Sequence, residues 1–315
     1  MASAALERPA TDRRTAEFLE AERALWAHHG LAPREIFVDV DAPRCRLRVL
    51  EIGSGEPVLL VHGTVGPGSW ASLAPELDGF RLLVLDRPGW GLSTPVDFRG
   101  ADYGRCVGEL LRGTLDALGL DRAHVVGGSI GDVWALRLAQ LHPSRVGRVA
   151  LLGAGPLVPE AGVPGIIRLI ASPAGAVLVR LLTSPARVRT MLRGAGHGAS
   201  LDAGQIPDVF VDWRASAARE TGAMRHERAM VRAIVDGRSY RPGLTFADDE
   251  LAAIRTPALM VYGTEDHVGS VDVWQRFTGV LADAELEVIG GAGHMPWFDD
   301  PAAVGERVQR FLTAR

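Results

Sequence analysis

Short, continuous runs of apolar residues mark the strand candidates along this chain. They occupy residues 58–61, 82–85, 125–126 and 149–152, and the same pattern returns at 258–263 and 286–290. Strands that are buried on both faces have this character, which predicts a parallel sheet covered by helices. Two earlier strands are expected at 36–40 and 45–50. The second of these should be half exposed, because apolar and basic residues alternate along it.

Amphipathic segments between the runs predict helices. Residues 15–29 gather Phe18, Leu19, Ala21, Leu25 and Trp26 on one side. A second helix is expected at about 102–118, where Gly119 provides a stop signal. The last helix should begin with Asp300 as N-cap and Pro301 at the first helical position. The alternation of strands and helices indicates an α/β fold with right-handed crossovers.

This alternation stops for about a hundred residues in the second half of the chain. Residues 155–249 contain several helical patterns that glycine and proline interrupt, and we call this segment the insertion. We therefore divide the chain into an N-terminal extension and helix at 1–32, a sheet domain at 33–154 and 250–315, and the insertion. The first ten or so residues are expected to be disordered. An insertion at the carboxyl edge of such a sheet would cover the ligand site as a lid.

One motif joins a strand, a glycine-rich turn and a helix. The sequence GGSIG at 127–131 fits G-x-S-x-G and directly follows an apolar strand. So sharp a turn has no room for side chains two positions either side of the serine, which explains Gly127 and Gly131. The turn lifts the Ser129 hydroxyl above the sheet edge and aims a helix N-terminus at the reaction centre. The motif predicts Ser129 as a nucleophile.

A serine nucleophile needs a base and an acid that orients the base. Glu265 and Asp266 lie just beyond the run 258–263, and His294 lies in a glycine-rich loop beyond the next run. The chain order serine, acid, histidine is the order expected with this motif. Strand ends at one sheet edge bring such residues together. We predict His294 as general base and Asp266 as orienting acid, with Glu265 as the alternative acid.

Negative charge on the substrate oxygen needs hydrogen-bond donors. The loop after the run 58–61 supplies one, and the backbone N–H groups of Thr64 and Ile130 are predicted to form an oxyanion hole. Trp90, Trp297 and His62 are candidate pocket residues. The alternative is core packing for the two tryptophans and a structural role in its loop for His62.

Two features of the insertion have competing explanations. Arg225, Arg228 and Arg232 share one helix face, which predicts a solvated surface. The alternative is that one of these arginines reaches a substrate carboxylate. His197 lies in a glycine-rich stretch, and we expect a loop or core histidine there, with pocket lining as the alternative.

Composition excludes several classes of chemistry. All 34 basic residues are arginines and the chain has no asparagine, for which a GC-rich genome is sufficient cause. Without lysine there is no Walker-A loop, pyridoxal Schiff base or lysine nucleophile. Without asparagine there is no N-glycosylation and no Cys-His-Asn protease. Histidines and cysteines show no metal-ligand spacing, so we expect no metal and no cofactor.

Charge and targeting signals are unremarkable. The net charge is −4 and no basic stripe stands out, which argues against nucleic acid as a partner. Cys45 and Cys106 are far apart in sequence, as in a reducing compartment. No apolar run reaches the ~18–20 residues that span a bilayer, and the N-terminus lacks the apolar core of a signal peptide. We expect a cytoplasmic protein that acts on a small molecule, with its oligomeric state left open.

Taken together, these pieces resemble the α/β-hydrolase family over nearly the whole chain. The matching motifs are HGT at 62–64, DRPGWGLS at 86–93, GGSIG at 127–131, GTED at 263–266 and GAGH at 291–294. The chain is similar to the lid-bearing esterase and C–C hydrolase branch. The resemblance implies a mostly parallel eight-stranded sheet with an antiparallel second strand and a helical lid after strand 6. It also implies Ser129, Asp266 and His294 as nucleophile, acid and base.

Asp132 departs from the family pattern, because many members have a second small residue after the motif. An acid in the first helical turn suits the helix dipole, and tuning of the pocket is the alternative. The main functional hypothesis is a serine hydrolase that cleaves a small to medium apolar ester, thioester or lactone through an acyl-enzyme. One alternative is hydrolysis of a carbon–carbon bond in a vinylogous diketone acid. Another is a non-catalytic ligand-binding protein on the same fold.

Overall fold

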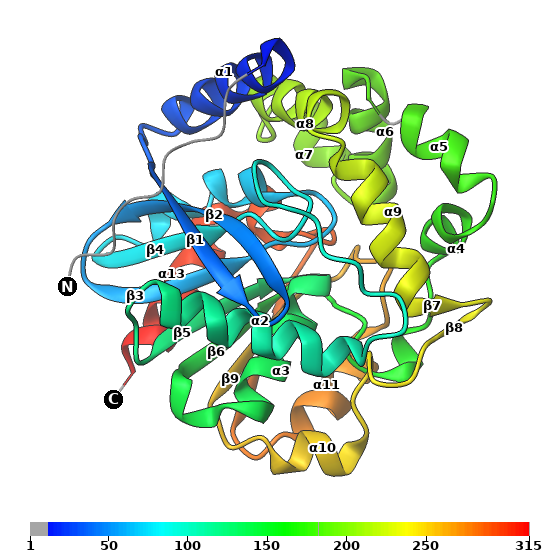
Figure 1. The fold of residues 1–315 in the computed structure, drawn as a ribbon. Helices are drawn as coiled ribbons and strands as arrows, with labels where there is room; N and C mark the ends of the chain where they lie inside the picture. The colour runs from blue at the N-terminus through cyan, green and yellow to red at the C-terminus, as the bar shows by residue number, and fades with distance from the viewer. Residues whose placement is uncertain (1–11, 182, 315) are drawn as a thin grey trace.

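The computed structural model describes residues 12–181 and 183–314, so the disorder predicted for the first ten or so residues lies outside it (Figure 1). An eight-stranded sheet has the order β1-β2-β4-β3-β5-β6-β9-β10. β2 (Arg44–Gly53) runs antiparallel to both neighbours, β1 (Arg34–Asp41) and β4 (Phe80–Leu85). The remaining pairs are parallel and involve β3 (Glu56–Val61), β5 (Ala123–Gly128), β6 (Val146–Leu152), β9 (Ala258–Gly263) and β10 (Ala284–Ile289). The predicted fold class is confirmed.

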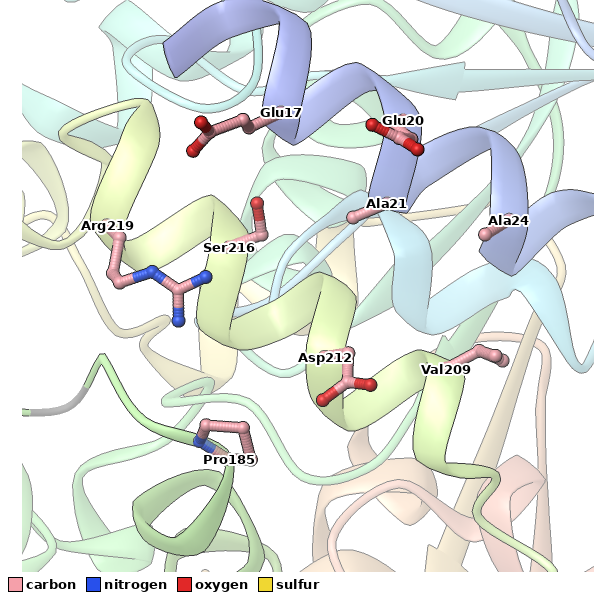
Figure 2. Close-up of a pocket in the computed structure, with 9 residues that line it drawn as sticks. All are labelled: Glu17, Glu20, Ala21, Ala24, Pro185, Val209, Asp212, Ser216 and Arg219. Atoms are coloured by element: carbon pink, nitrogen blue, oxygen red, sulfur yellow. The ribbon is translucent and has the colours of Figure 1, made fainter.

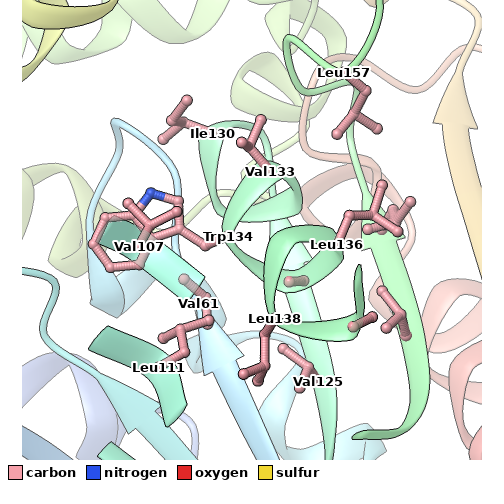
Figure 3. Close-up of a cluster of buried hydrophobic side chains, with 14 of the residues drawn as sticks. Val61, Val107, Leu111, Val125, Ile130, Val133, Trp134, Leu136, Leu138 and Leu157 are labelled. Atoms are coloured by element: carbon pink, nitrogen blue, oxygen red, sulfur yellow. The ribbon is translucent and has the colours of Figure 1, made fainter. Parts of the chain in front are cut away.

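Helices cover both faces of this sheet. β3 shows why, since Leu59 and Val61 belong to one hydrophobic cluster and Val58 and Leu60 to another. The first cluster includes side chains of α2 (Tyr103–Ala117) and α3 (Ile130–Leu141), as Figure 3 shows. It also includes side chains of α11 (Val271–Val280). The second contains side chains of α1 (Arg13–His28), α12 (Pro296–Asp299) and α13 (Pro301–Thr313). Burial on both faces accounts for the continuous apolar runs in the sequence.

The predicted boundaries of two helices agree well with the structure. α2 begins after Asp102, which accepts a hydrogen bond from the Arg105 backbone N–H. α13 begins after Asp300, which accepts from the Ala303 N–H at 3.0 Å, and Pro301 occupies the first helical position. Among the described helices, none is long and apolar enough to cross a membrane.

Between β6 and β9, which are neighbours in the sheet, the described chain first forms six α-helices. They are α4 (Gly165–Ala171), α5 (Gly175–Leu181), α6 (Pro185–Gly194), α7 (Gly198–Asp202), α8 (Asp208–Glu220) and α9 (Ala223–Ile234). A short hairpin of β7 (Val235–Asp236) and β8 (Ser239–Tyr240), which we did not predict, and α10 (Asp248–Ala253) lead back to the sheet. α1 packs beside α8, so the N-terminal helix contacts the insertion (Figure 1).

The exposure predicted for two strands is wrong. β2 is largely buried, and this includes Arg48, whose guanidinium is surrounded by carboxylates from three other parts of the chain: Glu22, Glu35 and Asp86. Burial alone lowers the pKa of Arg48, but the three carboxylates hold it above its usual value. The apolar run in β10 predicts a buried strand, yet β10 is an edge strand of the sheet and leaves Val288 37% exposed.

Candidate active site

The turn between β5 and α3 holds Ser129 in a strained conformation. Its φ of 56° makes it the one non-glycine residue with positive φ in the described part of the chain. Such strain costs about 1–3 kcal/mol and persists only where the surroundings enforce it. A Cβ on Gly131 would lie 2.0 Å from the Val61 carbonyl oxygen, and one on Gly127 would lie 2.7 Å from the Asp132 backbone. Both positions therefore need glycine, as predicted.

Three of the predicted residues form a continuous hydrogen-bonded chain. The Ser129 hydroxyl lies 3.0 Å from Nε2 of His294, and Nδ1 of the same ring lies 2.9 and 3.0 Å from the two carboxylate oxygens of Asp266. Asp266 is held in turn by the backbone N–H groups of Ala154 at 3.1 Å and Val268 at 2.9 Å. Residues that are far apart in sequence thus meet at the carboxyl ends of β5, β9 and β10.

The electrostatics of the hydrogen-bonded residues Ser129, His294 and Asp266 favour a proton on His294. Burial by itself lowers the pKa of His294, but the charge of Asp266 and its hydrogen bond raise the pKa above the usual value. Burial raises the pKa of Asp266, whereas His294 and the two backbone donors outweigh it and leave this pKa lowered. Asp266 therefore stays ionised while the ring beside it is a stronger base than a free histidine.

The loop after β3 approaches the serine closely. A Cβ on Gly63 would lie 2.8 Å from Cβ of Ser129, so only glycine fits at this contact. Thr64 follows it, and Ile130 begins α3 on the other side of the serine. Neither of their backbone N–H groups donates to another described residue. Both donors are therefore free for a ligand oxygen.

His62 has a structural environment. Its side chain is fully buried, and Nε2 accepts a hydrogen bond from the Arg87 backbone N–H at 3.1 Å. Burial, and then the charge of Arg87, lower the pKa of His62 well below its usual value. Arg87 also donates to the Gly63 carbonyl at 2.9 Å. His62 and Arg87 together fix the loop that carries Thr64, which favours the structural alternative for His62.

The two candidate tryptophans are both core residues. Trp297 stacks on Trp70 with 4.7 Å between ring centroids and donates to the Ser69 carbonyl at 2.7 Å. Trp90 is 1% exposed and donates to Glu227 of α9 at 2.7 Å. These contacts favour the packing alternative. They also show that a buried carboxylate of the insertion binds the loop after β4.

Arg214 of α8 is a residue that the sequence did not single out. It is 2% exposed, its Nη2 lies 3.4 Å from the Thr64 carbonyl oxygen, and its guanidinium stands 5.2 Å above the ring of Trp90. Its Nε and Nη1 are buried without a hydrogen-bond partner among the described residues. Burial lowers its pKa to about 10, against the raising effect of Glu227. A buried cation with free donors beside the Thr64 loop suits an anionic or carbonyl group of a ligand.

The arginines that the sequence did single out lie elsewhere. Arg225 and Arg232 are exposed, and Arg228 donates to the Ser172 carbonyl at 2.9 Å. The prediction of a solvated face is correct for Arg225 and Arg232. Helical spacing identified this face, whereas nothing in the local pattern distinguishes Arg214, because its burial depends on packing against distant loops.

Glu265 and Asp132, two further acidic residues near the sequence motifs, lie in different environments. Glu265 is exposed, whereas the Asp266 carboxylate lies within hydrogen-bond distance of the His294 ring, so Asp266 is the acid that reaches the ring. Asp132 is fully buried, and its Oδ2 accepts from the Gly155 N–H at 3.1 Å while Oδ1 has no partner among the described residues. Burial raises the pKa of Asp132 well above its usual value. Asp132 therefore joins the start of α3 to the turn after β6.

A separate surface cavity of about 360 Å³ lies between α1 and α8 (Figure 2). Glu17, Glu20, Asp212 and Arg219 are among its lining residues, and none of the predicted site residues is. All four of these charged side chains belong to exposed residues. We therefore assign this cavity no part in the chemistry at Ser129.

Known hydrolases resemble the chain over most of its length. It is 28% identical to a 2-hydroxy-6-oxononadienedioate/2-hydroxy-6-oxononatrienedioate hydrolase from Burkholderia vietnamiensis, over 86% of this chain and 92% of that protein. Naproxen esterase from Bacillus subtilis has a TM-score of 0.73 at 20% identity, covering 97% of this chain and all of that one. A meta-cleavage product hydrolase from Pseudomonas fluorescens has a TM-score of 0.66 at 22% identity, covering 87% and 96%. The two structural likenesses concern the fold alone.

The family assignment rests on the match to a family model. The family model described as alpha/beta hydrolase family matches residues 58–307, which is most of the chain. This stretch begins in β3 and includes the turn at Ser129, the loop at Asp266 and the loop at His294. The chain belongs to the alpha/beta hydrolase family.

Proposed function

We propose that the protein is a serine hydrolase in which Ser129 is the nucleophile, His294 the general base and Asp266 the orienting acid. The observation that carries this proposal is the unbroken chain of contacts from Ser129 Oγ through the imidazole to the carboxylate, at 3.0 and 2.9 Å. Distances of this length permit proton transfer from the serine to His294 as Oγ attacks. A non-catalytic binding protein on this fold would have no need of Asp266.

The N–H groups of Thr64 and Ile130 are our candidates for the oxyanion hole. Support comes from the contact of Gly63 with Ser129 and from the absence of an acceptor for either N–H among the described residues. Removal of one such donor typically costs about 10²–10³ in kcat. Because both donors are backbone groups, the test must shift the loop rather than delete a side chain.

The bond we propose is a carbon–carbon bond in a vinylogous diketone acid. The relative from Burkholderia vietnamiensis is named for dienedioate and trienedioate substrates of this kind, and its similarity extends over 86% of this chain. Arg214 supports the same class, since a buried guanidinium with two unpartnered nitrogens would bind a carboxylate or a conjugated oxyanion. The relatives thus favour the carbon–carbon alternative over the ester, thioester or lactone cleavage that was our main hypothesis from sequence.

The site residues accommodate each step. Ser129 Oγ adds to the ketone carbon and its proton passes to His294. The carbon–carbon bond then breaks, its electron pair leaves on the conjugated fragment, and the proton on His294 is transferred to that fragment. Water deprotonated by His294 cleaves the acyl-serine, releasing a carboxylic acid and restoring the Ser129 hydroxyl. One water is consumed for each bond broken.

A substrate comparison tests the proposed bond. Purified protein would be assayed with a panel of dienone acids and with nitrophenyl esters of similar size, using Ser129→Ala as the control for each. We expect a higher kcat/KM for the dienone acids and loss of both activities in Ser129→Ala. Preference for the esters would favour ester cleavage instead. Binding of the panel without turnover would favour a ligand-binding protein.

A further inference from the structure

A second histidine–aspartate pair lies next to the loop that carries His294. His197 immediately precedes α7 in the insertion and is fully buried. Its Nδ1 lies 2.8 Å from Oδ2 of Asp299, the last residue of α12. The hydroxyl of Ser200 donates to the other oxygen of Asp299. The pair therefore joins the insertion to the segment that follows His294.

Three consecutive backbone N–H groups around His294 donate to this junction. Gly293 donates to Asp299 Oδ2 at 2.8 Å, His294 donates to the Ala195 carbonyl at 2.9 Å, and Met295 donates to His197 Nε2 at 3.2 Å. Two of the three acceptors belong to the insertion, and the third is held by His197. The backbone of His294 is thus anchored at the residue itself and on both sides of it.

These bonds indicate the tautomer of His197. A backbone N–H can donate only to a ring nitrogen that carries no proton, so Nε2 is bare and the proton sits on Nδ1, where it is donated to Asp299. Both ring nitrogens are then occupied. Neither faces a hydroxyl or thiol, so this pair is not a second site of the Ser129 type.

Glycines bring the insertion into direct contact with both loops of the site. A Cβ on Gly196 would lie 2.6 Å from the Glu265 carbonyl oxygen and 2.9 Å from Cα of Gly293. A Cβ on Gly293 would lie 2.6 Å from the Ala195 carbonyl oxygen. Residues 195–197 therefore touch the loop that leads to Asp266 as well as the loop of His294.

We propose that His197 is a positioning residue that couples the seating of the insertion to the orientation of His294. This inference rests on the proposed function, because it assigns His197 a role only through the general base. When residues 195–197 are seated, the three N–H bonds set the His294 backbone and hence the 3.0 Å contact of Nε2 with Ser129. When they lift, the bonds to Ala195 and His197 are lost together. Errors of about 1 Å in such contacts cost about 10²-fold in rate.

Two substitutions separate the bonds that His197 makes. In His197→Gln the amide oxygen can take the place of Nε2 and accept from Met295, whereas Asp299 loses the donor that His197 supplied and keeps those of Gly293 and Ser200. In His197→Asn the amide can still donate to Asp299, whereas Met295 loses its acceptor. We expect His197→Asn to lower both kcat and the rate of Ser129 phosphonylation by a fluorophosphonate about 10- to 100-fold. His197→Gln should retain most of the wild-type rate.

A matched control distinguishes positioning from a general loss of stability. Val188→Ala truncates a buried apolar side chain of α6 in the same insertion and removes none of the hydrogen bonds of the His197 pair. It should lower the melting temperature while leaving the phosphonylation rate near wild type. Equal rates for His197→Asn and His197→Gln, or a rate in His197→Asn that merely follows its melting temperature, would overturn the proposal. If His294→Ala labels as fast as wild type, the proposed function fails instead.

Native-state hydrogen exchange of the wild type tests the coupling without any substitution. The N–H groups of His294 and Met295 should exchange together with those of α7, because opening of the insertion removes the acceptors of the first two and exposes the helix. If His294 and Met295 stay protected while α7 exchanges, the insertion does not hold the loop of His294, and the proposal is wrong. This measurement remains informative if the His197 variants do not fold.

Discussion

Replacing Asp266 by asparagine exchanges one carboxylate oxygen for an NH₂ group and disturbs four hydrogen bonds. Each carboxylate oxygen accepts from His294, and each also accepts from one backbone N–H, of Val268 at 2.9 Å or of Ala154 at 3.1 Å. Asparagine has one acceptor oxygen and one NH₂ donor. In either orientation its NH₂ therefore faces a buried N–H group, which costs about 1–3 kcal/mol of unfolding free energy.

The larger effect falls on His294. If the NH₂ of the new amide donates to Nδ1, the ring proton moves to Nε2, which can then no longer accept the proton of Ser129. The same tautomer error in a serine protease costs about 10⁴ in kcat, and we expect a loss on that order here. Removal of the Asp266 charge also leaves burial as the main influence on His294, so its pKa falls below the usual value.

The assay is kcat/KM as a function of pH for wild type and Asp266→Asn, with Glu265→Gln as the matched control. Activity requires unprotonated His294, so the acid limb of the wild-type profile lies at the raised pKa. In Asp266→Asn the residual activity should be low and its acid limb should move to lower pH. Glu265 is exposed and should be replaceable without effect. The reasoning is refuted if Asp266→Asn keeps near-wild-type activity with an unshifted acid limb, or if Glu265→Gln is equally damaging.

Three further predictions concern other buried ionisable residues. The raised pKa of Asp132 means that folding favours its protonated form, so its contribution to stability falls as pH rises from the ordinary aspartate range towards the raised pKa. Asp132→Asn keeps an oxygen for the Gly155 N–H, so its melting temperature should exceed that of the wild type by an amount that grows with pH. A constant difference in melting temperature between pH 3 and pH 8 would argue against a raised pKa of Asp132. Arg214→Met should raise KM for a carboxylate-bearing dienone about 10- to 100-fold and leave KM for neutral esters unchanged. Equal effects on the two KM values would contradict a role of Arg214 in anion binding. Glu22→Ala leaves Arg48 short of one buried partner and should cost about 3 kcal/mol in urea unfolding, with exposed Glu20→Ala as control; similar losses for the two would contradict the account of Arg48.

Local sequence signals were sufficient for much of the fold and for the residues that meet at Ser129. The turn at 127–131 requires glycines whose positions are visible in the chain, and parallel strands place their carboxyl ends at one edge whatever lies between them. That is why Ser129 and His294 could be paired across 165 positions. Runs of apolar residues also indicate buried strands, except at β10, where the position at the sheet edge depends on topology.

Features built from distant partners were not predictable in this way. Arg48 looks like an exposed residue of an alternating strand, and only the arrival of Glu22, Glu35 and Asp86 makes its burial favourable. Arg214 has no local signature, because the loop it contacts is 150 positions away. His197 was expected to be a loop or core histidine, and it is one. Its bonds to Asp299 and Met295 give it the role proposed above, and they arise only when the insertion meets the loop of His294.

The central claim is that Ser129 is a nucleophile activated by His294. Its most direct test is covalent labelling with a fluorophosphonate, followed by peptide mass spectrometry to locate the adduct. We predict a single adduct on the peptide containing Ser129 in the wild type, no adduct in Ser129→Ala, and greatly slowed labelling in His294→Ala. Equal labelling of the wild type and Ser129→Ala, or an adduct on another residue, would contradict the account.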